Sequence, residues 1–386
     1  MFVYFVILLV ILFGVFHFDI REQRYGRKFY SIFLYILVTL MIGLRYRVGG
    51  DALSYEYYYV HMPDLADYIA FIKRDVSFNY QPLYLLFVAL CKSINPDYYF
   101  YQLIHAIVVN GVITWFLYKN TQKFFTAILW LYILGIYFYF TFDIQREILA
   151  ICCFLLGYNA FQKNRWIVYY IYALLGFFFH ISASILLLLP LFKVIRLKPV
   201  VIYIIVAVSL ALVYFKSVFY NAISFLLVTE AMANKGKAYS EMEFSLAGLV
   251  FFFFGRVVLF LPFIITMIKN KDKAKEPLIT AMLIFVCFAQ VMVGFERMFN
   301  YLIIPLMAYI ADFIYDKKIY KLNFKKNLVI FSTYMSLFFI VCIKIVLDWN
   351  VTDRARYQAV FFPYSSVFDQ EENPERENYM IELWKR

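Results

Sequence analysis

Arginines stand at three junctions between long apolar runs of this 386-residue chain, which carries few other charges. The junctions hold Arg45 and Arg47 in residues 43–51, Arg146 in residues 143–147, and Arg297 beside Glu296. A charge within a membrane is costly unless it is paired or reached by water. The planar guanidinium also matches phosphate well, because it can donate two parallel hydrogen bonds. The three junctions therefore predict a site for an anionic substrate.

Each junction also has a purely structural explanation. Arg45 and Arg47 could reach from a helix end to the membrane interface, although cations on the outer side oppose the orientation rules. Arg146 could be neutralised by the adjacent Glu147 in a tight turn. The functional interpretation instead places Arg146 in the first turn of a helix, where free backbone N–H groups also attract anions.

Several other polar residues could act on such a substrate. His180 lies in an apolar stretch, where a lone histidine is more often a hydrogen-bonded packing residue. Asp51 follows a Gly-Gly pair that lets the backbone turn tightly, and Tyr55 could stack on a sugar ring. Gln145 directly precedes Arg146. No grouping of His, Cys, Asp or Glu has metal-ligand spacing, so we expect no metal and no other cofactor.

The elements that must position these residues are membrane helices. Hydrophobic residues make up 64% of the chain and charged residues 16%, whereas a soluble domain has roughly 25% charged residues. Each span must be helical so that its backbone polar groups are satisfied internally, which predicts an all-α polytopic integral membrane protein. The net charge of +11 resides largely in short loops between apolar runs, which favours cytoplasmic flanks over nucleic-acid binding. The first run, residues 2–16, has the features of a retained helix and not of a signal peptide.

Ten apolar runs are long enough to be spanning helices, and two more are ambiguous. The clear runs are 2–18, 29–44, 98–117, 124–141, 144–162, 199–216, 244–268, 277–294, 299–315 and 327–347. Residues 81–94 are short for a span, and residues 166–192 are long for one helix but could form a hairpin near His180. Either treatment gives about twelve transmembrane helices. We expect one transmembrane domain over residues 1–347 and an extracytoplasmic tail over residues 348–386.

Basic residues indicate the orientation. If six loops face the cytoplasm, they hold 20 of the 37 Lys and Arg residues; the loops are 19–28, 118–123, 162–165, 193–198, 269–275 and 316–326. This arrangement needs residues 81–94 to dip without crossing, and it places the three arginine junctions on one outer face. A rival arrangement lets 81–94 cross, keeps 166–192 as one long helix and places 118–123 outside. In both arrangements the N-terminus is outside.

Short segments spread over nearly the whole chain resemble the EpsG family of exopolysaccharide proteins, which belongs with the Wzy-type polysaccharide polymerases. The segments are GLRYRVGGDALSY (43–55), FNYQPLY (78–84), YFTFDIQREILAICCFLL (139–156), FFFHISASILLLLPLF (177–192), FERMFNYLIIPL (295–306) and FFPYSSVF (361–368). Two positions depart from the family pattern. Gly50 stands where many members have Thr, and Glu147 stands where many have Gly.

The resemblance implies an enzyme on the outer face of the bacterial cytoplasmic membrane, with a fold akin to the GT-C glycosyltransferases. Its substrate would be an oligosaccharide repeat unit on undecaprenyl diphosphate, and its partners membrane lipid, a flippase and a chain-length regulator. The family pattern gives functional weight to Arg45, Asp51, Arg146, His180 and Arg297, and the residues themselves add Arg47, Tyr55, Gln145 and Glu296. The expected roles fall into three groups. Arg45, Arg47, Arg146 and Arg297 would bind diphosphate, Tyr55 and Gln145 the sugar, and His180 or Asp51, with Glu296 behind them, would accept a proton.

Four other functions use some of the same features. A polysaccharide ligase or a single-step membrane glycosyltransferase would share the outer arginines, but ligases typically carry an outer loop longer than residues 216–243. A flippase for the lipid-linked sugar predicts paired broken helices and internal symmetry, and the sequence shows neither. A membrane acyltransferase using His180 would need a partner acid and an acyl donor from the cytoplasm.

Overall fold

The computed structural model describes residues 2–74, 80–215, 276–289, 294–315 and 360–384, and all of its regular elements are helices. The first 179 residues and the C-terminal tail hold the α-helices α1 (Phe2–Gly14), α2 (Arg27–Gly43), α3 (Ala52–His61), α4 (Tyr68–Arg74), α5 (Pro82–Ile94), α6 (Tyr98–Asn120), α7 (Phe124–Ile133), α8 (Ile136–Phe138), α9 (Gln145–Gln162), α10 (Trp166–Phe179) and α21 (Pro374–Trp384). The others are α11 (Ser184–Leu188), α12 (Pro199–Tyr214), α17 (Glu276–Phe288) and α18 (Gly294–Tyr315). The all-α prediction is therefore confirmed for these residues.

Local sequence signals set several helix ends. The Asp97 carboxylate accepts a hydrogen bond from the backbone N–H of Tyr99 at 3.0 Å, which caps the start of α6. Proline stands at the start of α5 and of α12, where its missing N–H costs no helical hydrogen bond. Gly135, with φ +68°, ends α7 in a left-handed conformation that glycine adopts without strain.

Three helices are long and apolar enough to cross a membrane: Phe2–Ile20, Tyr98–Asn120 and Arg297–Tyr315. They agree with the predicted spans 2–18, 98–117 and 299–315. The predicted span 124–141 is not one continuous helix, because Phe124–Ile133 and Ile136–Asp143 meet at 84° across Gly135. Spans 244–268 and 327–347 lie outside the described residues. The total of about twelve crossings and the GT-C-like fold stay predictions.

The two ambiguous stretches are short elements. Helix α10 ends at Phe179, His180 has extended backbone angles, and the following residues form 3₁₀ and α turns up to Lys193. One long helix over 166–192 is therefore excluded. Helix α5 has 13 residues, or about 20 Å at 1.5 Å per residue, which is shorter than the hydrocarbon core.

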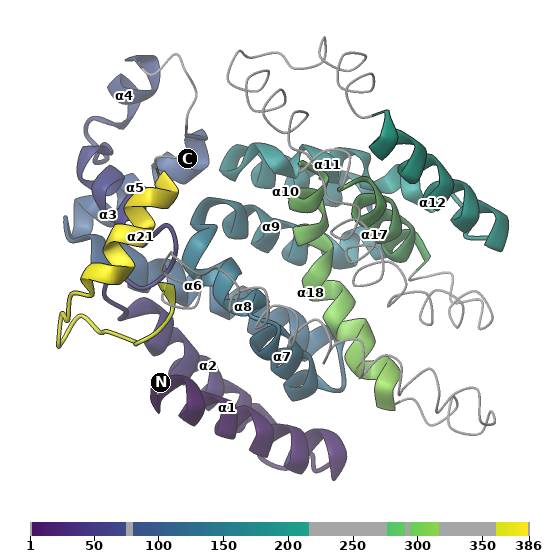
Figure 1. The fold of residues 1–386 in the computed structure, drawn as a ribbon, viewed down its shortest axis with the longest axis horizontal. Helices are drawn as coiled ribbons and strands as arrows, with labels where there is room; N and C mark the ends of the chain where they lie inside the picture. Colours follow the sequence, from purple (N-terminus) through teal and green to yellow (C-terminus); the bar gives the residue numbers. More distant parts are fainter. Residues whose placement is uncertain (1, 75–79, 216–275, 290–293, 316–359, 385–386) are drawn as a thin grey trace. The chain divides into compact units, whose positions relative to one another are not determined.

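The chain divides into two compact units. Unit 1 comprises residues 1–184, 307–316 and 341–386, and unit 2 comprises residues 185–306 and 317–340. In unit 1, α9 and α10 lie side by side (Figure 1), and a Cβ on Gly157 would come within 2.8 Å of Tyr172. In unit 2, Glu276 binds Arg196 at 2.9 Å, and Phe192 packs edge-on against Phe285.

Polar contacts gather at both ends of α2 and fix which loops of unit 1 share a side. Near its start, Arg27 donates hydrogen bonds to the carbonyl oxygens of Thr121 and Gln122. Loops 19–28 and 118–123 therefore lie at the same end, as the first arrangement requires, and the rival arrangement is wrong. At the other end of α2, residues 43–51 contact residues 142–143 and the strap, by which we mean residues 360–384.

Candidate functional site

A tight loop at the end of α2 begins the site. Gly49 has φ +121°, and a Cβ there would come within 2.9 Å of the Phe142 Cβ. The Gly50 N–H donates a 2.7 Å hydrogen bond to the Asp143 carboxylate. Glycine therefore lets the loop pack directly against the segment that leads into α9. Two of the three predicted arginine junctions are brought together in this way.

Arg45 lies buried inside this loop and holds it in shape. Its guanidinium donates hydrogen bonds to the carbonyl oxygens of Val48 and Ile42, at 2.9 and 2.5 Å, and lies 4.5 Å from the Phe142 ring centre. Because Ile42 lies in the last turn of α2, the cation also complements the negative end of the helix dipole. Gln102 donates to the backbone oxygen of Arg45 at 2.8 Å. These are the contacts of a residue that positions the loop.

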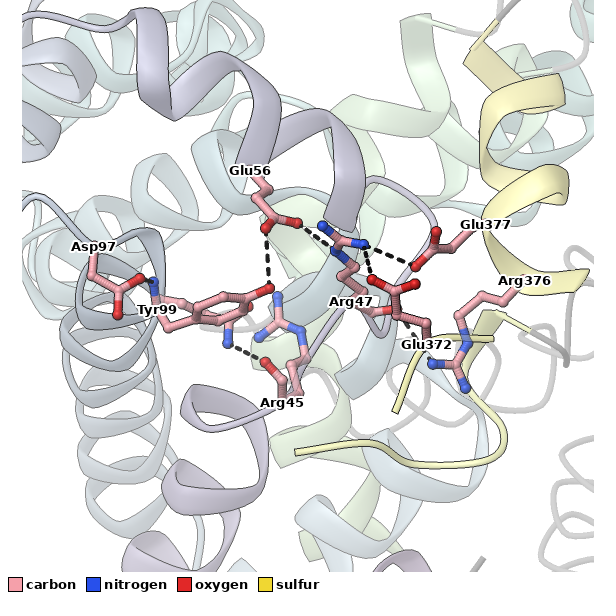
Figure 2. Close-up of polar contacts among 9 residues, drawn as sticks. Arg45, Arg47, Glu56, Asp97, Tyr99, Glu372, Arg376 and Glu377 are labelled. Atoms are coloured by element: carbon pink, nitrogen blue, oxygen red, sulfur yellow. Dashed lines mark hydrogen bonds and ion pairs between the residues drawn. The ribbon is translucent and has the colours of Figure 1, made fainter. Parts of the chain in front are cut away.

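Arg47 joins the loop to α3 and to the strap (Figure 2). Its guanidinium pairs with Glu56 on α3 at 2.9 Å and with Glu372 and Glu377 of the strap, each at 3.2 Å. Partial burial is the largest single influence and opposes its charge, but the hydrogen bonds to Glu56 and Glu377 and the negative charge of Glu56 together outweigh burial, so the pKa of Arg47 is raised above its ordinary value. Arg376 is buried nearby and donates to the carbonyl oxygens of Pro363 and Arg47.

Arg146 has different surroundings, because tyrosines lie against its guanidinium. It stands in the first turn of α9, where it hydrogen-bonds to Tyr55 and lies 4.9 Å from the Tyr80 ring centre. Tyr84 is also close to it. The residue is half-buried, and the free backbone N–H groups at the start of α9 add partial positive charge. This site combines a cation with aromatic rings.

Two other predicted residues adjoin Arg146. Asp51 stands at the N-cap position of α3, where its side chain makes no capping hydrogen bond. It is exposed, and it lies one helical turn before Tyr55 on the same face. Gln145 is buried and donates from its side chain to the Tyr98 hydroxyl at 3.0 Å. Its other amide atom, Oε1, has no hydrogen-bond partner among the described residues. The structure thus brings Asp51, Tyr55, Gln145 and Arg146 into one region.

His180 lies at the end of α10, in the same unit. Its Nδ1 accepts a hydrogen bond from the Ser182 backbone N–H at 3.3 Å and lies 2.6 Å from the Ser182 hydroxyl. The neutral ring therefore carries its proton on Nε2. One turn earlier, Gly176 packs against the Ala150 carbonyl, so in this antiparallel pair His180 lies level with the start of α9.

The third arginine junction belongs to the other compact unit of the chain. Arg297 is exposed in the first turn of α18, within unit 2, and the side chain of Glu296 lies outside the described residues. Their predicted roles stay predictions. In the described ranges, no three His, Cys, Asp or Glu side chains gather in a way that could hold a metal ion.

The sequence did not predict that the strap contacts the arginine loop, by which we mean residues 43–51. An antiparallel bridge joins Arg45 to Ser366, and the Tyr46 N–H donates to the Ser365 carbonyl at 2.8 Å. The signal that could have found it was charge: the tail from residue 369 onward is rich in acidic residues, and residues 45–47 carry two arginines. Tyr80 and Tyr84, which lie in the segment 78–84, also had no predicted role.

A family model for the EpsG family matches residues 28–366. The match begins at the start of α2, covers all three arginine junctions and ends at Ser366 in the strap. No curated protein and no solved structure matches the chain.

Proposed function

Because the chain belongs to the EpsG family, whose membership indicates a membrane protein of polysaccharide biosynthesis, we propose that it is a polysaccharide polymerase. It joins oligosaccharide repeat units, each carried on undecaprenyl diphosphate, at the outer face of the bacterial cytoplasmic membrane. The observation that supports this most is the setting of Arg146, a cation at a helix N-terminus among tyrosines. A sugar diphosphate presents an anion beside a ring of C–H groups, and this site complements both.

Arg146 stabilises the leaving group. In the proposed reaction, a hydroxyl of the incoming repeat unit attacks the anomeric carbon of the growing chain. A new glycosidic C–O bond forms as the C–O bond to undecaprenyl diphosphate breaks, and the diphosphate leaves with the bonding electrons. Arg146 and the N–H groups of α9 meet the charge that develops there. Arg45 and Arg47 are left out of this role, because carbonyl oxygens and carboxylates occupy their guanidinium groups.

The proton of the attacking hydroxyl goes to Asp51. The tautomer of His180 favours this assignment, because Nδ1 already accepts a hydrogen bond and Nε2 carries a proton. His180 is therefore suited to donate to a diphosphate oxygen, whereas the exposed Asp51 carboxylate can accept. Tyr55 lies between Asp51 and Arg146 and would contact the sugar at the bond that forms.

The proposal includes the supply and control of substrate. A flippase would deliver the lipid-linked repeat unit to the outer face, and a chain-length regulator would set polymer size. Arg297 would bind the second diphosphate, that of the incoming unit. These partners and this role follow from the family resemblance.

One observation favours a second function, that of a flippase for the lipid-linked sugar. The 84° break between Phe124–Ile133 and Ile136–Asp143 leads directly to Arg146, and transporters build substrate sites at such broken helices. A polysaccharide ligase or a single-step glycosyltransferase would use the same arginine site on another acceptor.

Product analysis separates these functions. The purified protein in lipid vesicles would be given undecaprenyl-diphosphate repeat unit prepared from the source cells, and the products would be separated on a gel. A ladder spaced by one repeat unit is expected of the polymerase. Unit moved across the bilayer without a ladder would establish a flippase, and unit transferred once to another acceptor would establish a ligase or single-step enzyme. Either result would contradict the proposal.

A further inference from the structure

A row of aromatic rings runs from Arg146 to the surface of unit 1. Its members come from α3, from the start of α5 and from the residue two positions before Pro82. They are Tyr84, Tyr80, Tyr58, Tyr57 and His61. Successive ring centres are 6.1, 6.1, 5.5 and 4.9 Å apart. We call this row the ring track.

Exposure rises along the track. Tyr84 is buried, Tyr80 is half-buried, and Tyr58 and Tyr57 expose 41% and 57% of their surface. His61 at the outer end is also exposed. The track therefore connects the half-buried Arg146 with solvent and presents ring surface over its outer half. Near its inner end lies the Tyr80 ring, and the Arg146 guanidinium lies 4.9 Å from the centre of that ring.

The chemistry of the track suits a linear oligosaccharide. A tyrosine ring offers an apolar face to the C–H groups of a pyranose, and its hydroxyl can bond to sugar hydroxyls. The spacing of the rings is comparable to the length of one sugar residue in an extended chain. Tyr57 and Tyr58 lie on α3 together with Tyr55 and Asp51, so one helix would carry both the reacting region and the outer rings.

We propose that the ring track is a series of subsites for the sugars of the substrate that lie beyond the reacting one. This inference rests on the proposed function, in which Arg146 holds the diphosphate of a lipid-linked sugar. The diphosphate would bind at the inner end, and the oligosaccharide would extend outward over Tyr80, Tyr58 and Tyr57. A substrate of several sugars would then bind more tightly than one of a single sugar.

The test measures binding without the lipid. The probe is a set of oligosaccharides of one to three repeat units, made by partial hydrolysis of the polysaccharide that the source cells export. Titration calorimetry with the protein in nanodiscs would give their dissociation constants. Wild type would be compared with Tyr58→Leu, Tyr57→Leu and Tyr58→Phe. Tyr25→Leu is the matched control, because Tyr25 is 95% exposed and belongs to the loop at the start of α2.

The expected results distinguish a sugar site from a membrane anchor. Tyr58→Leu and Tyr57→Leu should each weaken binding of the longer fragments about tenfold, the loss of one good stacking contact. Tyr58→Phe keeps the ring and should bind within about threefold of wild type, as should Tyr25→Leu. Equal affinity for all fragments in wild type and both leucine variants would overturn the inference and leave the rings as an interfacial belt.

The same variants separate this inference from the polymerase proposal. If wild type makes a ladder and the leucine variants make the same ladder with unchanged fragment affinity, the track fails and the polymerase stands. If wild type makes no ladder but binds fragments in a ring-dependent way, the track stands and the polymerase fails.

Discussion

At the scale of single residues, three arginines of one unit have three different settings. Arg45 is buried against backbone carbonyl oxygens, Arg47 pairs with three carboxylates, and Arg146 lies among tyrosines. Charge alone does not distinguish them, so the sequence assigned all three to the diphosphate. The partners of each guanidinium make the distinction, and they leave Arg146 as the candidate ligand within unit 1.

Replacing Arg146 with lysine should lower the polymerisation rate about 100-fold, a loss of the size seen when one donor to a developing anion is removed. Lysine keeps the charge but loses the planar fork and the stacking on Tyr80. Initial rates of ladder formation would measure the effect, with thermal unfolding in detergent as a check on folding. A folded Arg146→Lys protein with near-normal rate would remove Arg146 from the mechanism.

Asp51→Asn should lower the rate by roughly 10²–10⁴-fold, because an amide cannot accept the proton of the attacking hydroxyl. The loss of rate at acidic pH, which reports protonation of the base, should disappear from the residual activity. His180→Asn keeps a donor and should cost less. If His180→Asn abolished activity and the acidic limb while Asp51→Asn kept both, the two assignments would be reversed.

At the scale of elements, the strap and the arginine loop stabilise each other. Glu56 and Glu377 are about three-quarters buried, with 26% and 22% of their side-chain surface exposed, whereas Glu372 exposes 63%. Glu56→Gln should therefore lower the free energy of unfolding by about 1 kcal/mol, and Glu372→Gln by less than about 0.5 kcal/mol. Denaturant unfolding of the two variants would measure the difference. Equal losses would show that burial does not set the strength of these pairs.

Strap docking should also depend on pH through Asp369. Hydrogen bonds from the Ser366 hydroxyl and backbone N–H lower the pKa of Asp369 below its ordinary value. Because the folded pKa is the lower one, this stabilisation is complete above the ordinary carboxyl pKa of about 4 and is lost as pH falls through the folded value. Protease sensitivity of the tail should rise in that acidic range. Asp369→Asn should remove this pH response, and an unchanged response would contradict the assignment.

The sequence predicted where the helices lie better than it predicted where they bend or what their side chains contact. Apolar runs correctly predicted helices at α2, α6, α9 and α18, of which α6 and α18 contain stretches long and apolar enough to cross a membrane. The bend at Gly135 was missed, since one glycine in an apolar run is equally compatible with a straight helix. The partners of Arg47 were missed for another reason. Two of them, Glu372 and Glu377, lie more than 300 residues away in the chain, and no local pattern records such pairing.

At the scale of the whole molecule, the contact of Arg27 with the backbone of residues 121–122 decides between the two predicted arrangements of the spans, which the count of basic residues could not do. Counting preferred the first arrangement only modestly, whereas a direct contact requires the two loops to share a side. Which side faces the cytoplasm stays a prediction from the positive-inside rule. The strap and the Arg146 region would then lie outside.

Labelling of single cysteines would test this orientation. The four cysteines among the described residues, Cys91, Cys152, Cys153 and Cys287, are buried, which favours a low background. A cysteine at exposed Glu375 should react with an impermeant maleimide added to whole spheroplasts, and one at exposed Gln122 should react only after lysis. The opposite pattern would invert the protein and place the Arg146 region in the cytoplasm.

The central claim is that Arg146 serves the chemistry of polymerisation, and release of undecaprenyl diphosphate from a defined repeat unit tests it most directly. Wild type, Arg146→Ala and the control Arg165→Ala would be compared in lipid; Arg165 is exposed at the other end of the α9–α10 pair. We predict that wild type and Arg165→Ala release one diphosphate lipid for each glycosidic bond in the ladder, and that folded Arg146→Ala releases at least about 100-fold less. Equal release by all three proteins would contradict the account.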